Sequence, residues 1–183
     1  MGIQHLDVSK GGYSRVTFSK NLAFFTGHAA PQYQTLKELA EGILERYDEL
    51  FKHFGLKKSN ILYTTCFMKN ADDEDEFADI YFQWIDPKNP PAGVTVTALP
   101  IQHSPVGDNI LMELSFIVAT NDSLPIKRYD VTRGCRMVEY DGMAYFTGHV
   151  YPKVDTLGEQ VAGVLNRLDE LFEKFGLKME NVI

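Results

Sequence analysis

The most regular pattern of apolar and polar positions lies between Thr35 and Gly55. Apolar side chains recur there every three or four residues, a spacing that places them along one face of an α-helix. Thr35 stands three residues before Glu38, a combination typical of a helix N-cap, and Gly55 follows the last apolar residue, as is common at a helix end. The pattern therefore predicts a helix with one apolar face that begins after Thr35 and ends at Gly55.

Segments rich in β-branched and aromatic residues surround this helix and predict strands. Residues 14–27 read as two strands around a turn, and three more strands are predicted at residues 60–68, 94–99 and 110–119. A second helix follows an acidic run at residues 72–76, which is expected at a helix N-terminus and does not by itself indicate a cation site. The order β, β, α, β, α, β, β predicts an α+β domain, in which one mixed sheet carries both helices on one face. The other face is then expected to contact water or another subunit.

Two ten-residue segments are nearly the same: residues 22–31 read LAFFTGHAAP and residues 143–152 read MAYFTGHVYP. With Gly27 placed on Gly148, an offset of 121, the similarity continues without a gap over residues 13–62 and 134–183. This pattern indicates an internal duplication. It predicts a complete unit at residues 1–123, a polar connector at 124–132, and the N-terminal β-β-α half of a second unit at 133–183.

Two explanations of the half unit remain open. The chain is a fragment of a longer tandem protein, or the half unit docks or swaps onto another copy of the chain. Both start from the same physical problem, because a hairpin with one helix buries little apolar surface by itself.

Composition and charge narrow the possible functions. Apolar residues make up 44% of the chain, enough for a packed core, while no apolar run is long enough to span a bilayer and the first ten residues lack the apolar centre of a signal peptide. We therefore expect a soluble, cytoplasmic protein that does not act at a membrane. A net charge of -7 without a basic cluster argues against nucleic acid as a partner. Cys66 and Cys135 form no CxxC pair, so we predict buried or half-buried thiols and neither a disulfide nor a metal site. We also expect no cofactor.

The order and spacing of these segments resemble the RidA (YjgF) family of imine and enamine deaminases, also known as the endoribonuclease L-PSP group. The matching features are GGY at residues 11–13, which lies fourteen positions before the glycine of TGH, the segment FGLKKSNILYTTCFMKNADDEDEF, and the strand pair TALP and MELSFIVA. The resemblance covers residues 11–120 and, less completely, 133–183. It implies a chorismate-mutase-like fold, a homotrimer, and sites for a small-molecule substrate in the clefts between subunits.

The resemblance also implies a catalytic arrangement. Family deaminases hold the substrate carboxylate with an arginine before the fourth strand and use a glutamate on the fifth strand to position water. Glu113 matches this glutamate and is the only charge within ILMELSFIVA. The arginine position holds Pro91 or Gly93, depending on the alignment, so the usual carboxylate clamp is missing. Tyr13 and Thr26 match substrate-binding positions that face the cleft.

Each candidate has a structural alternative. His28 stands where the family has glutamine and could position water or donate a proton, or its ring could be held by a backbone carbonyl. Arg15 or Arg128 could replace the missing clamp. Arg15 is the better candidate because it is close to Tyr13, yet its counterpart Arg136 also fits a structural ion pair. Tyr13 could be a packed aromatic residue, and Glu113 a solvated glutamate at a sheet edge.

Two functions follow from these residues. The first is a RidA-like hydrolase of the imine or enamine deaminase type, which acts on a small metabolite with Glu113 orienting water. The second is a non-catalytic trimeric module that binds small molecules or other proteins. The missing arginine favours the binding module, and the retained Glu113 favours the enzyme. The acidic composition does not support ribonuclease activity.

Overall fold

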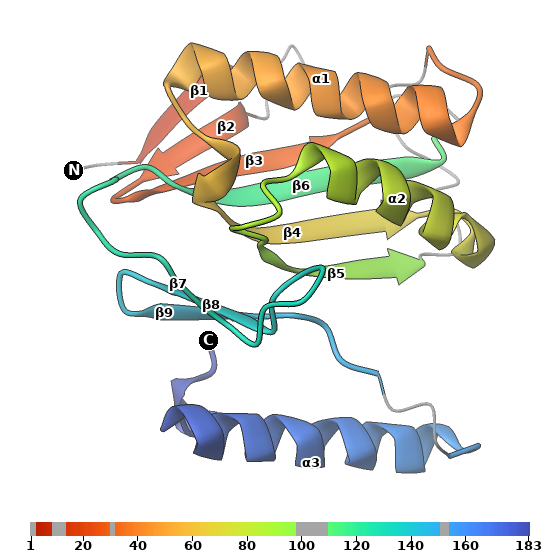
Figure 1. Ribbon diagram of the computed structural model, residues 1–183, viewed down its shortest axis with the longest axis vertical. Helices are drawn as coiled ribbons and strands as arrows, with labels where there is room; N and C mark the ends of the chain where they lie inside the picture. The colour runs from red at the N-terminus through yellow and green to blue at the C-terminus, as the bar shows by residue number, and fades with distance from the viewer. Residues whose placement is uncertain (1–2, 9–13, 30–31, 98–109, 151–153) are drawn as a thin grey trace. The chain divides into compact units, whose positions relative to one another are not determined.

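A computed structural model describes residues 3–8, 14–29, 32–97, 110–150 and 154–183 of the chain (Figure 1). Tyr13, one of the candidate site residues, lies outside these ranges. The chain separates into two compact units, residues 1–147 and residues 148–183, which are described separately.

A six-stranded mixed sheet forms the centre of the first unit (Figure 1). Its strands, in spatial order, are β1 (Gln4–Val8), β2 (Ser14–Ser19), β3 (Leu22–His28), β6 (Met112–Ala119), β4 (Ile61–Met68) and β5 (Ala92–Thr97). All neighbours are antiparallel except β4 and β5, which are parallel. The predicted strands and the mixed sheet are thus confirmed, while β1 is a strand that the sequence pattern did not predict.

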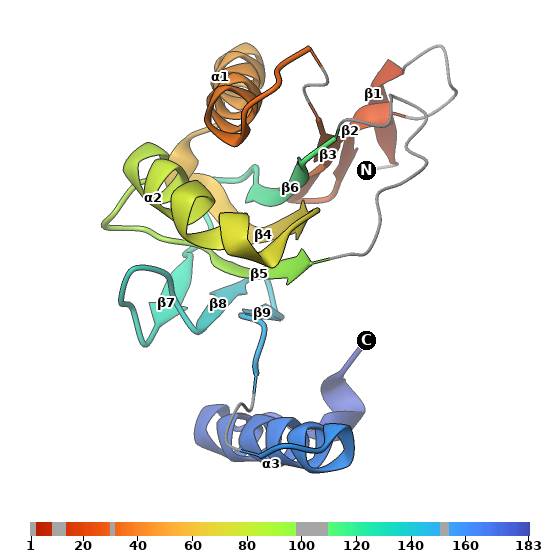
Figure 2. The same cartoon turned by 90° about the vertical axis from the view of Figure 1, so that its right-hand side faces the viewer.

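Two helices, α1 (Leu36–Phe54) and α2 (Glu74–Trp84), cover the same face of this sheet (Figures 1 and 2). A short 3₁₀ turn at Lys58–Asn60 precedes β4, and another at Ala71–Asp73 precedes α2. The predicted caps of α1 are present: the backbone N–H of Glu38 donates to the hydroxyl of Thr35 at 3.3 Å, and Gly55 adopts a left-handed conformation with φ 67°. These contacts satisfy backbone groups that a helix end otherwise leaves unpaired.

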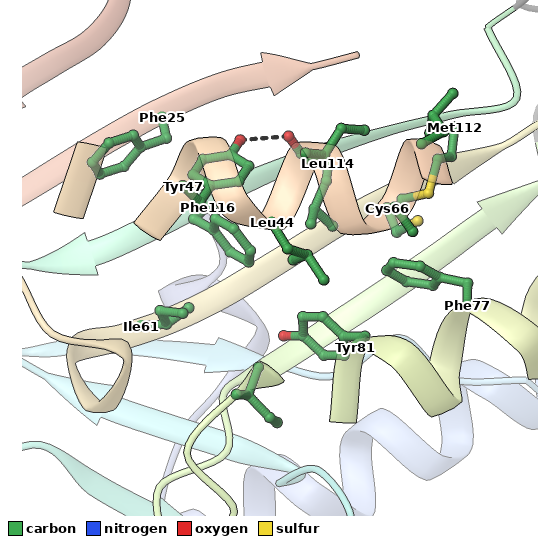
Figure 3. Packing of buried hydrophobic residues seen from close by; sticks show 14 of the residues in the cluster. Phe25, Leu44, Tyr47, Ile61, Cys66, Phe77, Tyr81, Met112, Leu114 and Phe116 are labelled. Carbon is green, nitrogen blue, oxygen red and sulfur yellow. Dashed lines mark hydrogen bonds between the residues drawn. The ribbon is translucent and has the colours of Figure 1, made fainter. Parts of the chain in front are cut away.

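The main core lies between the two helices and the sheet, with Tyr47 of α1 near its centre (Figure 3). Its ring makes edge contacts with Phe25 and Phe116, and its hydroxyl donates to the backbone carbonyl of Leu114 at 2.6 Å. Burial raises the pKa of Tyr47 well above its ordinary value, and the charge of Glu113 raises that pKa further. The hydroxyl is therefore neutral and serves to join α1 to β6.

A second, three-stranded antiparallel sheet packs on the opposite face of the six-stranded sheet. It contains β7 (Lys127–Tyr129), β8 (Met137–Tyr140) and β9 (Met143–Phe146). We call the face that points away from α1 and α2 the far face; it includes Thr17, Phe24, Phe67, Glu113 and Ile117. A second apolar cluster joins the two sheets and contains Leu62, Ala92, Ala119, Cys135, Val138 and Tyr140.

The expectation that the far face contacts only water or another subunit is therefore wrong for the part that this cluster covers. The physical reason is a change of side chains between the two hairpins. Val138 and Tyr140 stand at the positions of Thr17 and Ser19 in the offset of 121, so β8 presents apolar groups where β2 presents polar ones.

The connector at residues 124–132 also has a defined structure. It contains β7, and the guanidinium of Arg128 donates to three backbone carbonyls, those of Ser59 at 2.7 Å, Pro90 at 2.9 Å and Ile61 at 3.2 Å. The connector thus ties the second sheet to the ends of two strands of the first.

The second unit contains α3 (Leu157–Phe175), followed by a 3₁₀ turn at Met179–Asn181. The helix has 19 residues, an N-cap at Thr156 and a left-handed glycine at Gly176, as α1 has 19 residues with Thr35 and Gly55. The predicted helix is confirmed at these positions.

Candidate functional site

Glu113 lies on the far face of the sheet, next to a strand irregularity. Its neighbours Met112 and Leu114 are buried in the main core, so strand alternation turns Glu113 to the opposite side, where it is half-buried. The pairing of β3 with β6 shifts between Phe25 and His28, as in a β-bulge. This shift brings Gly27 beside Glu113.

Position 27 requires a glycine because the side chain of Glu113 lies in close contact with the backbone there. A methyl group at Gly27 would overlap the Cγ, Cδ and Oε1 atoms of Glu113. The side chain of Glu113 therefore lies directly over the backbone of β3, and any larger residue at position 27 would displace it. The TGH motif thus contributes a surface on which the carboxylate is held.

Arg15 and Thr26 lie on the β2 side of this glutamate. The hydroxyl of Thr26 donates to the backbone carbonyl of Arg15 at 3.2 Å, which places the two residues side by side on adjacent strands. Both belong to the far face, because Val16 and Phe25 beside them are buried in the main core. Arg15 is on β2, the strand next to the one that holds Gly27. Because adjacent strands are about 4.8 Å apart, the long side chain of Arg15 can span the distance to Gly27.

His28 lies on the other face of the sheet. It is 4% exposed, its Nδ1 is 2.8 Å from the carbonyl oxygen of Thr26 and 2.9 Å from the hydroxyl of Tyr47, and its ring makes an edge contact with the ring of Tyr47. Because the carbonyl can only accept, Nδ1 carries the proton of that bond. The predicted catalytic combination of His28 with Glu113 is not formed, since the bulge turns His28 into the core. The contact of its ring with the carbonyl of Thr26 agrees with the structural alternative, a histidine held by a backbone carbonyl.

The positions of the missing arginine are covered by the second sheet. The N–H of Cys135 donates to the carbonyl of Pro91 at 3.3 Å, and the N–H of Gly93 donates to the hydroxyl of Thr147 at 3.3 Å. Arg128 does not replace the clamp, because its guanidinium is engaged with three backbone carbonyls. Burial lowers the pKa of Arg128, and the carbonyl bonds stabilise its charge there. Arg15, beside Thr26 on the far face, is the other candidate clamp.

The two thiols are buried, as predicted. Burial raises the pKa of Cys66 to about 12 and that of Cys135 to about 11. Both are therefore neutral thiols near pH 7 and poor nucleophiles. Within the described ranges, no three histidine, cysteine or acidic side chains gather closely enough to hold a metal ion. No helix among the described residues has the length and apolar character needed to cross a bilayer.

Sequence reasoning missed the residues on the β4 side of Glu113. Phe67 is its cross-strand neighbour, and Val96 of β5 is the neighbour of Phe67. Both are apolar, yet they are 37% and 38% exposed. The signal was available in principle, because alternation along β4 and β6 puts Phe67 and Glu113 on one face once the strand register is known.

Comparisons with known proteins agree with this architecture. Residues 4–119 match the family described as endoribonuclease L-PSP. A RutC family protein of Haemophilus influenzae is 32% identical over 88 residues, which are 46% of this chain and 75% of that protein.

Solved structures show the same fold. A YjgF-family protein of Neisseria meningitidis superimposes with a TM-score of 0.59 at 20% identity, covering 67% of this chain and 98% of the other. Yeast Mmf1 superimposes with a TM-score of 0.56 at 16% identity, covering 66% of this chain and 100% of the other. At these identities the likeness concerns the fold alone, and it confirms the α+β class with a mixed sheet and helices.

Proposed function

Because the chain belongs to the endoribonuclease L-PSP family, the RidA (YjgF) group that its sequence resembles, we propose that its first unit is a hydrolase of the imine or enamine deaminase type that acts on a small metabolite. The observation that carries this proposal is the position of Glu113. Its carboxylate lies on the far face, in the part that the second sheet leaves uncovered, and is held against Gly27.

The proposed reaction needs one base and one water molecule. Glu113 accepts a proton from water while the water oxygen bonds to the carbon of the C=N group, and the electron pair of the broken π bond goes to nitrogen. The proton then passes to nitrogen, which gives a carbinolamine. The carboxylate next accepts the hydroxyl proton of this intermediate and passes it to nitrogen as the C–N bond breaks, so the products are a carbonyl compound and ammonia. Every atom of the imine and the water is accounted for, so no cofactor is needed.

Arg15 is the proposed partner of a substrate carboxylate. It lies one strand beyond Gly27 on the same face, and a guanidinium can bind a carboxylate with two parallel hydrogen bonds. Thr26 supports this position through its bond to the Arg15 backbone. Tyr13, which the resemblance implies in substrate binding, is two residues before Arg15 in the chain and is retained in the proposal.

The experiment that tests the proposal measures ammonia release. Freshly generated imines of alanine and of 2-aminobutanoate are given to the full chain and to the Glu113→Gln variant, which keeps the shape of the side chain and removes the base. We expect release above the spontaneous rate and a loss of about 100-fold or more in the variant, the usual size of a general-base contribution. Glu74→Gln, at an exposed acidic position on α2, is the control and should keep full activity.

A second function is favoured by one observation. The missing arginine and the cover over Pro91 and Gly93 remove the usual clamp, which suits a scaffold that binds a small molecule without turnover. In that case the wild type releases no ammonia above the spontaneous rate, while a bound ligand still raises the unfolding temperature. For either function we expect the homotrimer that the resemblance implies, and the exposed apolar part of the far face supports such an association.

A further inference from the structure

One hydroxyl from helix α1 joins the two strands that hold Glu113 and Gly27. The hydroxyl oxygen of Tyr47 is 2.6 Å from the carbonyl oxygen of Leu114 on β6 and 3.1 Å from that of Thr26 on β3 (Figure 3). Leu114 directly follows Glu113 in the chain, and Thr26 directly precedes Gly27. Helix α1 is therefore bonded, from the core side, to the two strands that carry the carboxylate and its glycine on the far face.

His28 supplies a second donor at the same place. Its Nδ1 is 2.8 Å from the carbonyl oxygen of Thr26 and 2.9 Å from the hydroxyl oxygen of Tyr47. A tyrosine hydroxyl has a single proton, and the shorter contact assigns it to the carbonyl of Leu114, so the Nδ1–H of His28 is the donor to Thr26. Burial raises the pKa of Tyr47 and the charge of Glu113 raises it further, so this hydroxyl keeps its proton near neutral pH.

These hydrogen bonds are made at the bulge itself. Two residues of β3, Thr26 and Gly27, oppose the single residue Ser115 of β6. A bulge interrupts the ladder of hydrogen bonds between two strands, and buried backbone groups at that point need other partners. Tyr47 and His28 provide such partners. Without them the bulge would relax, and the backbone at Gly27 would move relative to the carboxylate above it.

From this arrangement we infer that Tyr47 and His28 are positioning residues for Glu113. The inference rests on the proposed function. Both side chains lie in the core, on the side of the sheet opposite to the carboxylate, so they act through the backbone of the bulge. The bulge places Gly27, and the close contact at Gly27 sets where the carboxylate lies. That position matters because a general base has to be within hydrogen-bond reach of the water while the water faces the carbon that it attacks.

A matched pair of tyrosine variants tests the positioning. Tyr47→Phe removes the hydroxyl and keeps the ring. Tyr81→Phe is the control, because Tyr81 is also a buried tyrosine of the main core whose hydroxyl has a buried side-chain partner, the hydroxyl of Thr64 at 2.7 Å. Tyr81 is on α2 and Thr64 is on β4, whereas the bulge is formed by β3 and β6. For each full-length variant, kcat and KM are measured for ammonia release from the imine of alanine, together with the unfolding temperature.

We expect Tyr47→Phe to lower kcat about 10-fold or more and to change KM less than about 3-fold, because a misplaced base weakens the reacting step and not the binding of the substrate. Tyr81→Phe should lower the unfolding temperature by a similar amount and keep kcat within about 2-fold. An equal loss of kcat in both variants overturns the inference, as does a Tyr47→Phe variant that changes KM alone.

Two variants of His28 test its part in the pair. His28→Gln keeps an N–H group that can donate to the carbonyl of Thr26, and His28→Leu fills the space without a donor. We expect His28→Gln to keep kcat within about 3-fold, and His28→Leu to lose about 10-fold or more, as Tyr47→Phe does. Losses of the same size in the two variants would overturn the role of His28.

Amide hydrogen exchange separates this inference from the proposed reaction, because it reports local opening and needs no turnover. In Tyr47→Phe we expect the amides of Gly27 and His28 to exchange about 10-fold faster or more, while those of β4 and β5 keep their rates. Tyr81→Phe should leave the amides of the bulge unchanged. If the wild type releases no ammonia but the bulge opens in this way, the proposed reaction fails and the positioning of the Glu113 carboxylate stands. If exchange at the bulge is the same in Tyr47→Phe as in the wild type, the inference is refuted even where Glu113 proves catalytic.

Discussion

Helices α1 and α3 share a length of 19 residues, a threonine N-cap and a left-handed glycine at the end, yet their apolar faces have different environments. Leu44 of α1 is 3% exposed, whereas Leu165, its counterpart at the offset of 121, is 47% exposed. Caps and periodicity are local, so both helices have them. Burial depends on what packs against the helix, and the apolar face of α1 packs against β3, β6 and β4. The comparison separates the determinants of helix formation from those of stability.

The hairpins β2–β3 and β8–β9 also differ in the polarity of one face. In the first hairpin, β2 presents Thr17 and Ser19 on the far face, while β8 of the second hairpin presents Val138 and Tyr140 and buries them against the first sheet. A few apolar replacements therefore convert a hairpin with a partly polar face into one that covers another sheet.

The largest effect is expected where the same substitution is made in both helices. Leu44→Ala should lower the free energy of unfolding by about 2–5 kcal/mol, because it leaves a cavity in the main core. Leu165→Ala should change it by less than about 1 kcal/mol, because the side chain is half exposed. Urea denaturation of the two variants measures the difference. Equal losses would mean that α3 is covered to the same degree as α1.

A smaller effect is expected from exchanging the far-face residues of the hairpins. Val138→Thr should lower the free energy of unfolding by about 1–3 kcal/mol, because it buries a hydroxyl at a fully covered position. Thr17→Val, the reverse exchange in β2, should stay within about 0.5 kcal/mol. Thermal unfolding gives both values. A neutral Val138→Thr would show that the second sheet does not depend on its apolar contact with the first.

The smallest effect concerns pH and the two thiols, Cys66 in β4 and Cys135 two residues before β8. Burial raises the pKa of Cys66 to about 12 and that of Cys135 to about 11, above the ordinary range near 8.5. The folded state therefore keeps protons that the unfolded state loses as pH rises past about 9, so the free energy of unfolding decreases with increasing pH. Each thiol should cost about 1 kcal/mol between pH 8 and pH 9.5.

Urea denaturation at the two pH values measures this slope. Cys66→Val and Cys135→Val should each flatten it, and the double variant should flatten it most. An unchanged slope in the double variant would assign the pH dependence to other groups.

Much of the candidate site could be read from the sequence, because the family motifs name Glu113, Thr26 and Tyr13 and show that the arginine is missing. The neighbours of Glu113 could not be read in this way. Phe67 and Val96 are 46 and 17 residues away in the chain, and only strand pairing brings them to the carboxylate. Pairing between distant strands has no local signal, since any strand of suitable pattern can form it.

The sequence by itself determined the helices with their caps, most of the strands, the offset of 121 between similar segments, and membership of the family, because each of these depends on local spacing. The tertiary structure alone decided which face each site residue occupies. Simple alternation puts Phe24, Thr26 and His28 on one face, but the bulge after Phe25 turns His28 to Tyr47 and leaves Glu113 on the other side. One extra residue in a strand reverses every side chain that follows it, and that residue is specified by its partner strand and not by its own segment.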